Sequence, residues 1–248
     1  MMKKLLVALL VWLPTLTIAA GGGASECPQD PAPVDLRDKA QLQRGAKYYV
    51  NYCLGCHSLK YQRYGRLGED LEIPKELVEQ NLMFTGEQVG NTMNIAMPAV
   101  DAEKWFGVLP PDLSLKARVR GTDWIYNYLR SFHKDDSRPY GVNNLCFPDV
   151  GMPHVMADLQ GIQDRGHETR LIDDEQKEFY IGLEVVEPGS LTPEEYDQVS
   201  ADLAAFLTYV GEPVQVERQD LGWKVLLFIF IFFIFAYALK REYWKDIH

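Results

Sequence analysis

The chain has little positive charge, few cysteines and no internal repeat. Its 25 lysines and arginines stand against 35 aspartates and glutamates, a formal net charge of −10. A net negative charge of this size repels nucleic acid and attracts basic partners, or simply keeps the protein soluble. Only four cysteines occur, and no further ligands follow at the spacing that a zinc site needs. With 47% apolar residues and no low-complexity tract, the chain is expected to fold.

The N-terminus has the pattern of a secretory signal peptide. Two lysines precede an apolar run from Leu5 to Leu16, and small residues follow up to Ala20. The alternative, a membrane anchor, fits less well because the run is short and is broken by Pro14. We therefore expect residues 1–20 to be a signal peptide that exports the rest of the chain.

The C-terminus is predicted to cross a membrane once. The run 221–239 contains only one charged residue, Lys224, and a helix of that length spans about 28 Å. Cations cluster in the tail 240–248, and cationic loops stay on the cytoplasmic side. The acidic body, residues 21–220, is therefore expected on the other side of the membrane.

Apolar residues at helical spacing predict three helices in the exported part, over 38–52, 122–132 and 192–210. Asp38 with Gln41 is expected to cap the first helix, and Thr192 with Glu195 forms a capping box at the third. Between the helices the chain is rich in Gly, Pro and Asp, which implies long ordered loops. A large flat cofactor to wrap would explain them. A short polar linker is expected over 211–220.

The motif that carries chemistry is Cys53-Leu54-Gly55-Cys56-His57, the C-x-x-C-H spacing of covalent haem attachment. Two thiols at this spacing reach the two vinyl groups on one haem edge, while His57 lies under the ring and binds iron. Export to an oxidising compartment favours this interpretation. A thioredoxin-like pair, a zinc half-site and a structural disulfide are the alternatives, and each lacks its usual sequence context.

A six-coordinate haem needs a second axial ligand, and spacing alone leaves the choice open. Met97 follows His57 at a distance common in small cytochromes, while Met152 lies between a glycine and a proline that fix its backbone. A thioether would raise the reduction potential and an imidazole would lower it. The candidates are Met83, Met93, Met97, Met152, Met156, His133, His154 and His167.

Several further stretches, spread over nearly the whole mature chain, resemble the cytochrome c1 family. They are Arg44-Gly45-Ala46-Lys47-Tyr48-Tyr49, Ser58-Leu59-Lys60-Tyr61, Leu109-Pro110-Pro111-Asp112-Leu113-Ser114, Ala117-Arg118-Val119-Arg120, Gly151-Met152, the helix from Thr192 and the anchor that ends in Ala238-Leu239-Lys240-Arg241.

The resemblance implies a set of haem contacts. His57 and Met152 would be the axial ligands, and Arg120 would approach a haem propionate, which a guanidinium can pair with bidentately. Pro110 or Pro111 is expected to offer a backbone carbonyl to the other ring nitrogen of His57, which would fix its tautomer.

The expected fold is mainly α, a cytochrome c-like haem domain with long loop insertions plus one C-terminal transmembrane helix. By resemblance, it lies on the periplasmic face of a bacterial inner membrane with its C-terminus cytoplasmic. It would take electrons from the Rieske iron-sulfur protein and pass them through one haem c to a soluble cytochrome c. Cytochrome b would be its partner in a dimeric ubiquinol:cytochrome c reductase, and catalysis would belong to that complex.

Some features leave other interpretations open. Cys27 and Cys146 are left over from the haem motif, and two spare thiols in an exported protein favour a disulfide. The acidic stretches 173–175 and 184–195 could steer a basic electron acceptor. A terminal-oxidase cytochrome, a haem peroxidase and an anchored scaffold protein are the alternative functions.

Overall fold

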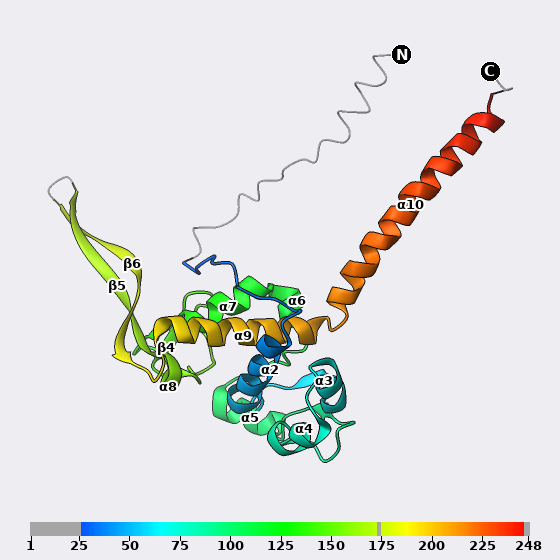
Figure 1. Cartoon of the computed structure of the whole chain (residues 1–248). Helices are drawn as coiled ribbons and strands as arrows, with labels where there is room; N and C mark the ends of the chain where they lie inside the picture. Colours follow the sequence, from blue (N-terminus) through cyan, green and yellow to red (C-terminus); the bar gives the residue numbers. More distant parts are fainter. Residues whose placement is uncertain (1–25, 173–174, 246–248) are drawn as a thin grey trace.

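The computed structural model describes residues 26–172 and 175–245, so the expected signal peptide lies outside the described residues. The body is built around two crossing helices, α2 (Lys39–Tyr48) and α9 (Pro193–Gly211). Helix α9 runs the length of the body, with a two-stranded ribbon at one end and a long isolated helix at the other (Figure 1). The mainly helical fold that the sequence predicts is confirmed.

The crossing of α2 over α9 depends on Gly45. A Cβ atom at this position would stand 2.1 Å from the carbonyl oxygen of Asp202 and 2.6 Å from Cβ of Phe206, so only glycine allows the two backbones to approach this closely. Beside it, Arg44 donates to both carboxylate oxygens of Asp202 at 2.7 and 3.0 Å. Asp202 is only 1% exposed, and a buried carboxylate needs such a partner.

The helix boundaries follow their local signals. Asp38 accepts a hydrogen bond from the amide of Gln41 at the start of α2, as expected. Thr192 and Glu195 form the expected capping box at the start of α9, with Pro193 in the first turn. Helix α7 (Thr122–Arg130) packs against α9 and ends close to its expected boundary.

The other elements are short and lie around this frame. They are the π-helical turn η1 (Tyr49–Cys53), β1 (Leu59–Arg63), α3 (Tyr64–Asp70), α4 (Lys75–Asn81), β2 (Thr92–Met93), α5 (Ala99–Phe106), α6 (Lys116–Arg120), β3 (Phe132–Lys134), β4 (Val142–Asn144) and α8 (Ala157–Gln160). Strand β1 pairs with β2, and β3 pairs with β4, both antiparallel.

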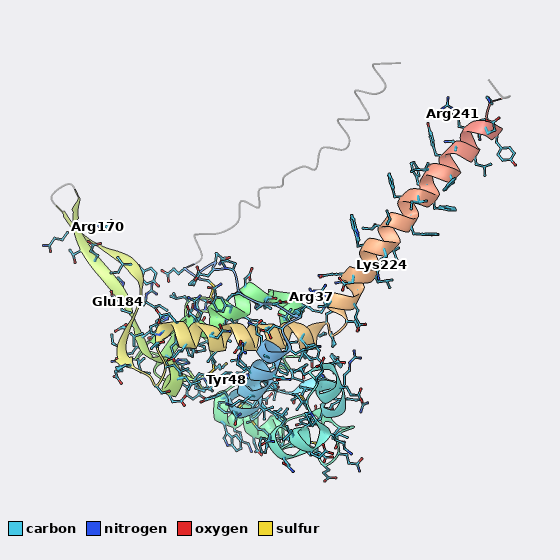
Figure 2. All side chains as sticks on the ribbon, in the orientation of Figure 1. Arg37, Tyr48, Arg170, Glu184, Lys224 and Arg241 are labelled. Carbon is cyan, nitrogen blue, oxygen red and sulfur yellow. A yellow bond between two sulfur atoms is a disulfide. The ribbon has the colours of Figure 1, made fainter. Side chains whose placement is uncertain are left out.

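The structure differs from the expected loops over 161–188, where β5 (Gly161–Ile172) and β6 (Glu175–Pro188) form a long antiparallel hairpin. The hairpin projects from the body, and Figure 2 shows Arg170 and Glu184 along it. Its apolar residues are solvated, with Ile181 51% and Val186 53% exposed. Only Ile181, Leu183 and Val185 alternate with other residues in this region, and charged residues are frequent elsewhere in both strands, so the sequence signal for a strand is short.

Helix α10 (Gln215–Tyr243) is long and apolar enough to cross a membrane, and none of its residues is buried within the chain. It begins before the expected span because residues 215–220 are helical, which reduces the linker to 212–214. Lys224 lies near the domain and Arg241 near the far end (Figure 2). An ion pair of 2.7 Å from Arg37 to Asp220 ties the start of α10 to the body.

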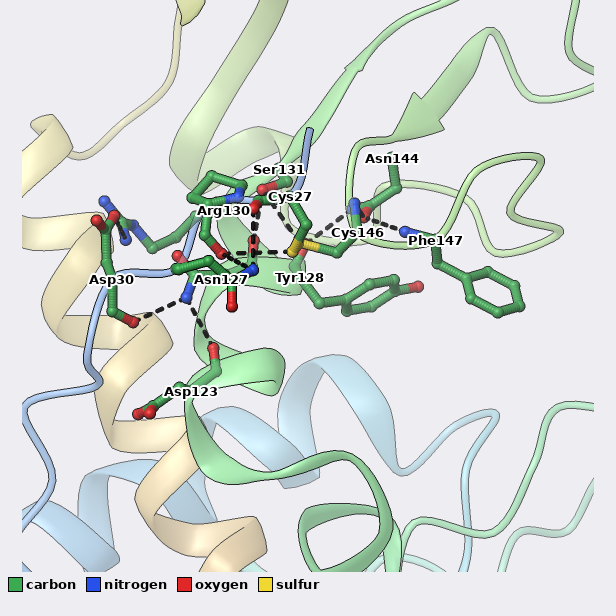
Figure 3. Close-up of a disulfide and its surroundings, with 12 residues drawn as sticks. Cys27, Asp30, Asp123, Asn127, Tyr128, Arg130, Ser131, Asn144, Cys146 and Phe147 are labelled. Carbon is green, nitrogen blue, oxygen red and sulfur yellow. Dashed lines mark hydrogen bonds and ion pairs between the residues drawn. A yellow bond between two sulfur atoms is a disulfide. The ribbon is translucent and has the colours of Figure 1, made fainter. Parts of the chain in front are cut away.

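Cys27 and Cys146 form the disulfide that the two spare thiols favoured, over a sequence separation of 119. The bond joins the N-terminal segment to the loop after β4 (Figure 3). In the same close-up, Asn127 donates to the carbonyl of Asp30, a second tie of the N-terminal segment. The hydrogen bond holds this segment against α7, and the disulfide holds it to the loop after β4.

The close contact at Gly45 predicts that alanine at this position destabilises the protein, the opposite of the usual effect of alanine in a helix. Replacing glycine by alanine inside a helix normally stabilises a protein by about 1 kcal/mol, whereas Gly45→Ala should lower stability by about 1 to 3 kcal/mol because the helices must separate. Thermal unfolding of the full chain in detergent measures this. Gly90→Ala, whose Cβ would meet nothing within 4 Å, is the control. A stabilised Gly45→Ala protein would contradict the close crossing.

Candidate haem site

The C-x-x-C-H motif lies where α2 ends. The helix widens into η1, in which the amide of Leu54 donates to the carbonyl of Tyr49 at 2.9 Å. The amides of Cys56 and His57 then both donate to the carbonyl of Cys53, at 3.0 and 2.9 Å. The chain therefore closes into a tight turn that presents the two thiols and the imidazole together.

The thiols of Cys53 and Cys56 are both free. Cys53 is buried, and burial together with the neighbouring Cys56 raises the pKa of its thiol to about 12. Burial also raises the pKa of the Cys56 thiol, which is partly exposed. Neither cysteine is committed to a disulfide, as attachment of a haem by thioether bonds requires.

His57 is held at two points. Its Nδ1 lies 2.7 Å from the carbonyl oxygen of Pro111, and its own backbone carbonyl accepts a hydrogen bond from the hydroxyl of Tyr49. Burial lowers the pKa of His57, against the smaller effect of the Pro111 contact, so the ring is neutral. A carbonyl only accepts, so Nδ1 carries the proton and Nε2 keeps a free lone pair. The expected carbonyl contact is confirmed, and Pro111 provides it.

The loop that carries Pro111 is fastened to the residues after the haem motif. The carboxylate of Asp112 accepts from the amide of Lys60 at 2.9 Å and from the amide of Ser114 at 3.0 Å. The amide of Leu113 donates to the carbonyl of Ser58 at 2.9 Å. These bonds set the position of the Pro111 carbonyl, and that carbonyl orients the ring of His57.

The methionines occupy different environments. Met93 and Met156 are buried in the hydrophobic core, and Met83 packs against that core. Met97 and Met152 are both partly exposed. Of the two, Met152 has a defined sulfur contact, because the hydroxyl of Tyr128 donates to its Sδ at 3.3 Å.

The candidate histidines lie in three different environments. His133 lies buried in β3, with its Nδ1 3.4 Å from the carbonyl of Ser131. The ring of His154 stacks on Phe132 with centroids 4.7 Å apart, and its burial lowers the pKa to about 4. His167 lies in β5, with its ring 6.2 Å from that of Tyr180.

Arg120 ends α6 with its side chain exposed. Its guanidinium lies 5.0 Å from the ring of Trp124 and 5.9 Å from that of Phe147. Within residues 26–172 and 175–245, no carboxylate lies within ion-pair distance of it. Its charge is therefore available to an anionic group of a ligand.

The residues present fit a c-type haem. The two free thiols match its vinyl groups, and no described residue hydrogen-bonds to Nε2 of His57. Nearby, Val108 and Leu109 remain 52% and 44% exposed. A Cβ at Gly151 would lie 3.3 Å from Cγ1 of Val108, so these apolar side chains adjoin the Met152 loop. A porphyrin would cover apolar surface that is otherwise costly to leave in water.

A c-type cytochrome with one helix able to span a membrane is the class of protein that this fold and site define. A model of the Cytochrome C1 family matches residues 31–171 and 181–247, and the chain belongs to this family. The unmatched residues between the two ranges include the end of β5 and the start of β6.

Three relatives illustrate the similarity. Cytochrome c1 of Allochromatium vinosum is 51% identical over 248 residues, which cover all of both chains. A protein of Nitrosomonas europaea named ammonia monooxygenase gamma subunit is 43% identical and covers 100% of this chain and 99% of its own. Cytochrome c1 of Rhodospirillum rubrum is 28% identical, with 85% of this chain and 83% of its own covered.

Family membership establishes the general role of the chain. It is an electron-transfer subunit of the bc1 type that carries covalently bound haem c and is anchored in a membrane. Two contributors at the site were not predicted from the sequence, the hydroxyls of Tyr49 and Tyr128. Both tyrosines lie in helical segments where apolar spacing indicates core packing, so no local signal distinguishes their hydrogen bonds.

Asp112→Ala should loosen the loop that orients His57. Two amides lose their acceptor, and at about 0.5 to 1.5 kcal/mol for each hydrogen bond the holoprotein should lose about 1 to 3 kcal/mol of stability. Asp112→Asn keeps one acceptor oxygen and should lose less. Urea unfolding followed by haem absorbance measures both variants. Asp101→Ala, which removes an exposed partner 3.7 Å from Lys104, is the control. Equal stability of all three variants would contradict this role of Asp112.

Proposed function

We propose that the chain takes electrons from the Rieske iron-sulfur protein and passes them through one haem c to a soluble cytochrome c. Cytochrome b would be its membrane partner in a dimeric ubiquinol:cytochrome c reductase. The observation that carries this proposal is the neutral His57, which the Pro111 carbonyl holds with Nε2 free, directly after two free thiols. The chain itself transfers electrons, and quinol chemistry belongs to the complex.

The proposed attachment is through thioether bonds to Cys53 and Cys56, with His57 Nε2 and Met152 Sδ as axial ligands. The core positions of Met93 and Met156 support the choice of Met152, since a buried packing role accounts for those two. The bound haem would supply an iron that cycles by one electron. A thioether ligand favours the ferrous state and so suits a carrier near the oxidising end of a chain.

Arg120 is proposed to pair with a haem propionate. Its support is the exposed guanidinium, which stacks against Trp124 and has no ion-pair partner among the residues described. Stacking leaves the edge of the guanidinium free, and that edge matches a carboxylate in bidentate geometry.

The proposed location of the haem domain is the periplasmic side of a bacterial inner membrane, with the C-terminus in the cytoplasm. The cationic residues Lys240, Arg241 and Lys245 after the span support this orientation. Acidic residues within 184–195 suit a basic electron acceptor, whose attraction salt would screen. Asp173 and Asp174, which belong to the first acidic stretch, lie outside the described residues.

A second candidate is an electron-transfer subunit that serves a membrane monooxygenase. The observation that favours it is the name of the relative from Nitrosomonas europaea, whose similarity covers the whole chain. The haem chemistry would be the same in both cases, so the partners decide between them. Those partners differ in their cofactors, which makes the question accessible to purification.

Met152→Leu should abolish the methionine ligation. The ferric holoprotein should become high-spin and the ferrous form should bind carbon monoxide, because leucine has no lone pair to give to iron. Reduced-minus-oxidised spectra measure this, after a denaturing gel shows that haem stays attached. Met97→Leu is the matched control and should remain low-spin. The opposite pattern would move the ligand to Met97.

Purification of the full chain in mild detergent, through a tag on its C-terminus, should recover b-type haem and a two-iron cluster at fixed ratios. Optical spectra report the haem, and electron paramagnetic resonance reports the cluster. Mock purification from cells that carry the untagged chain is the control. Recovery of monooxygenase polypeptides at a fixed ratio, without b haem or cluster, would favour the monooxygenase candidate and contradict the reductase.

A further inference from the structure

The sulfur of Met152 has one hydrogen-bond donor in the structure. The hydroxyl of Tyr128 lies 3.3 Å from Sδ, within the range of hydrogen bonds to sulfur. A thioether sulfur can only accept, so the phenol proton points to it. Burial, with a smaller contribution from Cys53, raises the pKa of Tyr128 well above its usual range.

The ring of Tyr128 is fixed from both sides. Trp124 stacks on it with centroids 5.0 Å apart and planes inclined by 14°, and Phe132 meets it edge-on at 5.3 Å. Trp124 also lies against Arg120, whose guanidinium is 5.0 Å from its ring. A ring packed in this way cannot turn its hydroxyl elsewhere without losing both aromatic contacts.

The backbone of Tyr128 is tied to the loop that leads to Met152. The carbonyl of Tyr128 accepts a hydrogen bond of 2.8 Å from the side-chain amide of Asn144. The carbonyl oxygen of that same amide accepts from the backbone of Cys146 and Phe147, at 2.9 and 3.2 Å. Figure 3 shows Asn144 close to Cys146, with Tyr128 beside the disulfide. The helix that carries the donor, Tyr128, is therefore hydrogen-bonded to the loop that leads to the acceptor, Met152.

We propose that Tyr128 is a positioning residue that directs Met152 Sδ and raises the reduction potential of the haem by hydrogen-bonding to that sulfur. The proposal rests on Met152 being the axial ligand. A sulfur that shares one lone pair with a donor gives less density through its other lone pair. Ferric iron needs that density more than ferrous iron does, so the hydrogen bond favours the reduced state.

Tyr128→Phe tests the proposal in the full-length holoprotein. The variant keeps the ring and its stacking but removes the donor, so the potential should fall. We expect the equilibrium constant for reduction to drop about three- to tenfold, as for the loss of one hydrogen bond. A tenfold drop is a shift of 59 mV for one electron. Redox titration monitored by the haem absorbance measures it.

A second readout separates tuning from simple loss of packing. The ferric protein should exchange Met152 for added imidazole several-fold faster in Tyr128→Phe, while its low-spin spectrum without imidazole stays that of the parent. Tyr126→Phe is the matched control, because it removes a hydroxyl from the same helix on a ring that faces Arg130. The control should change neither the potential nor the exchange rate.

The outcomes separate this inference from the ligand assignment. If Met152→Leu becomes high-spin while Tyr128→Phe keeps the parent potential and exchange rate, the ligand assignment stands and the role of Tyr128 is wrong. If Met152→Leu remains low-spin, the ligand assignment fails and the inference fails with it. A lowered potential in Tyr128→Phe, with an unchanged Tyr126→Phe control and a high-spin Met152→Leu, supports both.

Discussion

The hydrogen bond from the imidazole of His57 to the carbonyl of Pro111 is the contact on which the haem site depends. It fixes one tautomer of a neutral ring and leaves Nε2 as the only nitrogen with a lone pair. The bond is possible only because the Pro111 loop is fastened to the strand after the motif through the carboxylate of Asp112. The hydroxyl of Tyr49 donates a hydrogen bond to the backbone carbonyl of His57. These hydrogen bonds hold the side chain of His57 in one orientation.

This local order rests on the helix frame. Helix α2 delivers the motif, and α2 is held at α9 by the close approach at Gly45 and by the buried pair of Arg44 with Asp202. Helix α7, which also packs against α9, carries Tyr128, whose hydroxyl donates to Met152 Sδ. Helix α9 therefore packs against both α2, which leads to the two thiols, and α7, which contacts Met152. The covalent disulfide adds a tie at the far end of α7.

The predictability of each feature follows from the range of its interactions. The capping box of Thr192 with Glu195 and the motif from Cys53 to His57 are local patterns, and the sequence shows both of them directly. The pairing of Cys27 with Cys146 was accessible by elimination in an exported chain. The β5–β6 hairpin was missed, because its alternation of apolar residues is confined to Ile181, Leu183 and Val185 and charged residues are frequent in the rest of both strands.

The sequence by itself determined the covalent chemistry of the site, the membrane-crossing character of α10 and the family, because each is written in residue type and near spacing. Only the tertiary structure decided which of the two prolines faces His57 and that Tyr128 donates to Met152. Those contacts join residues 54 and 24 positions apart in the chain. Their geometry depends on how α2, α7 and α9 pack, and packing is a property of surfaces that no single stretch of sequence contains.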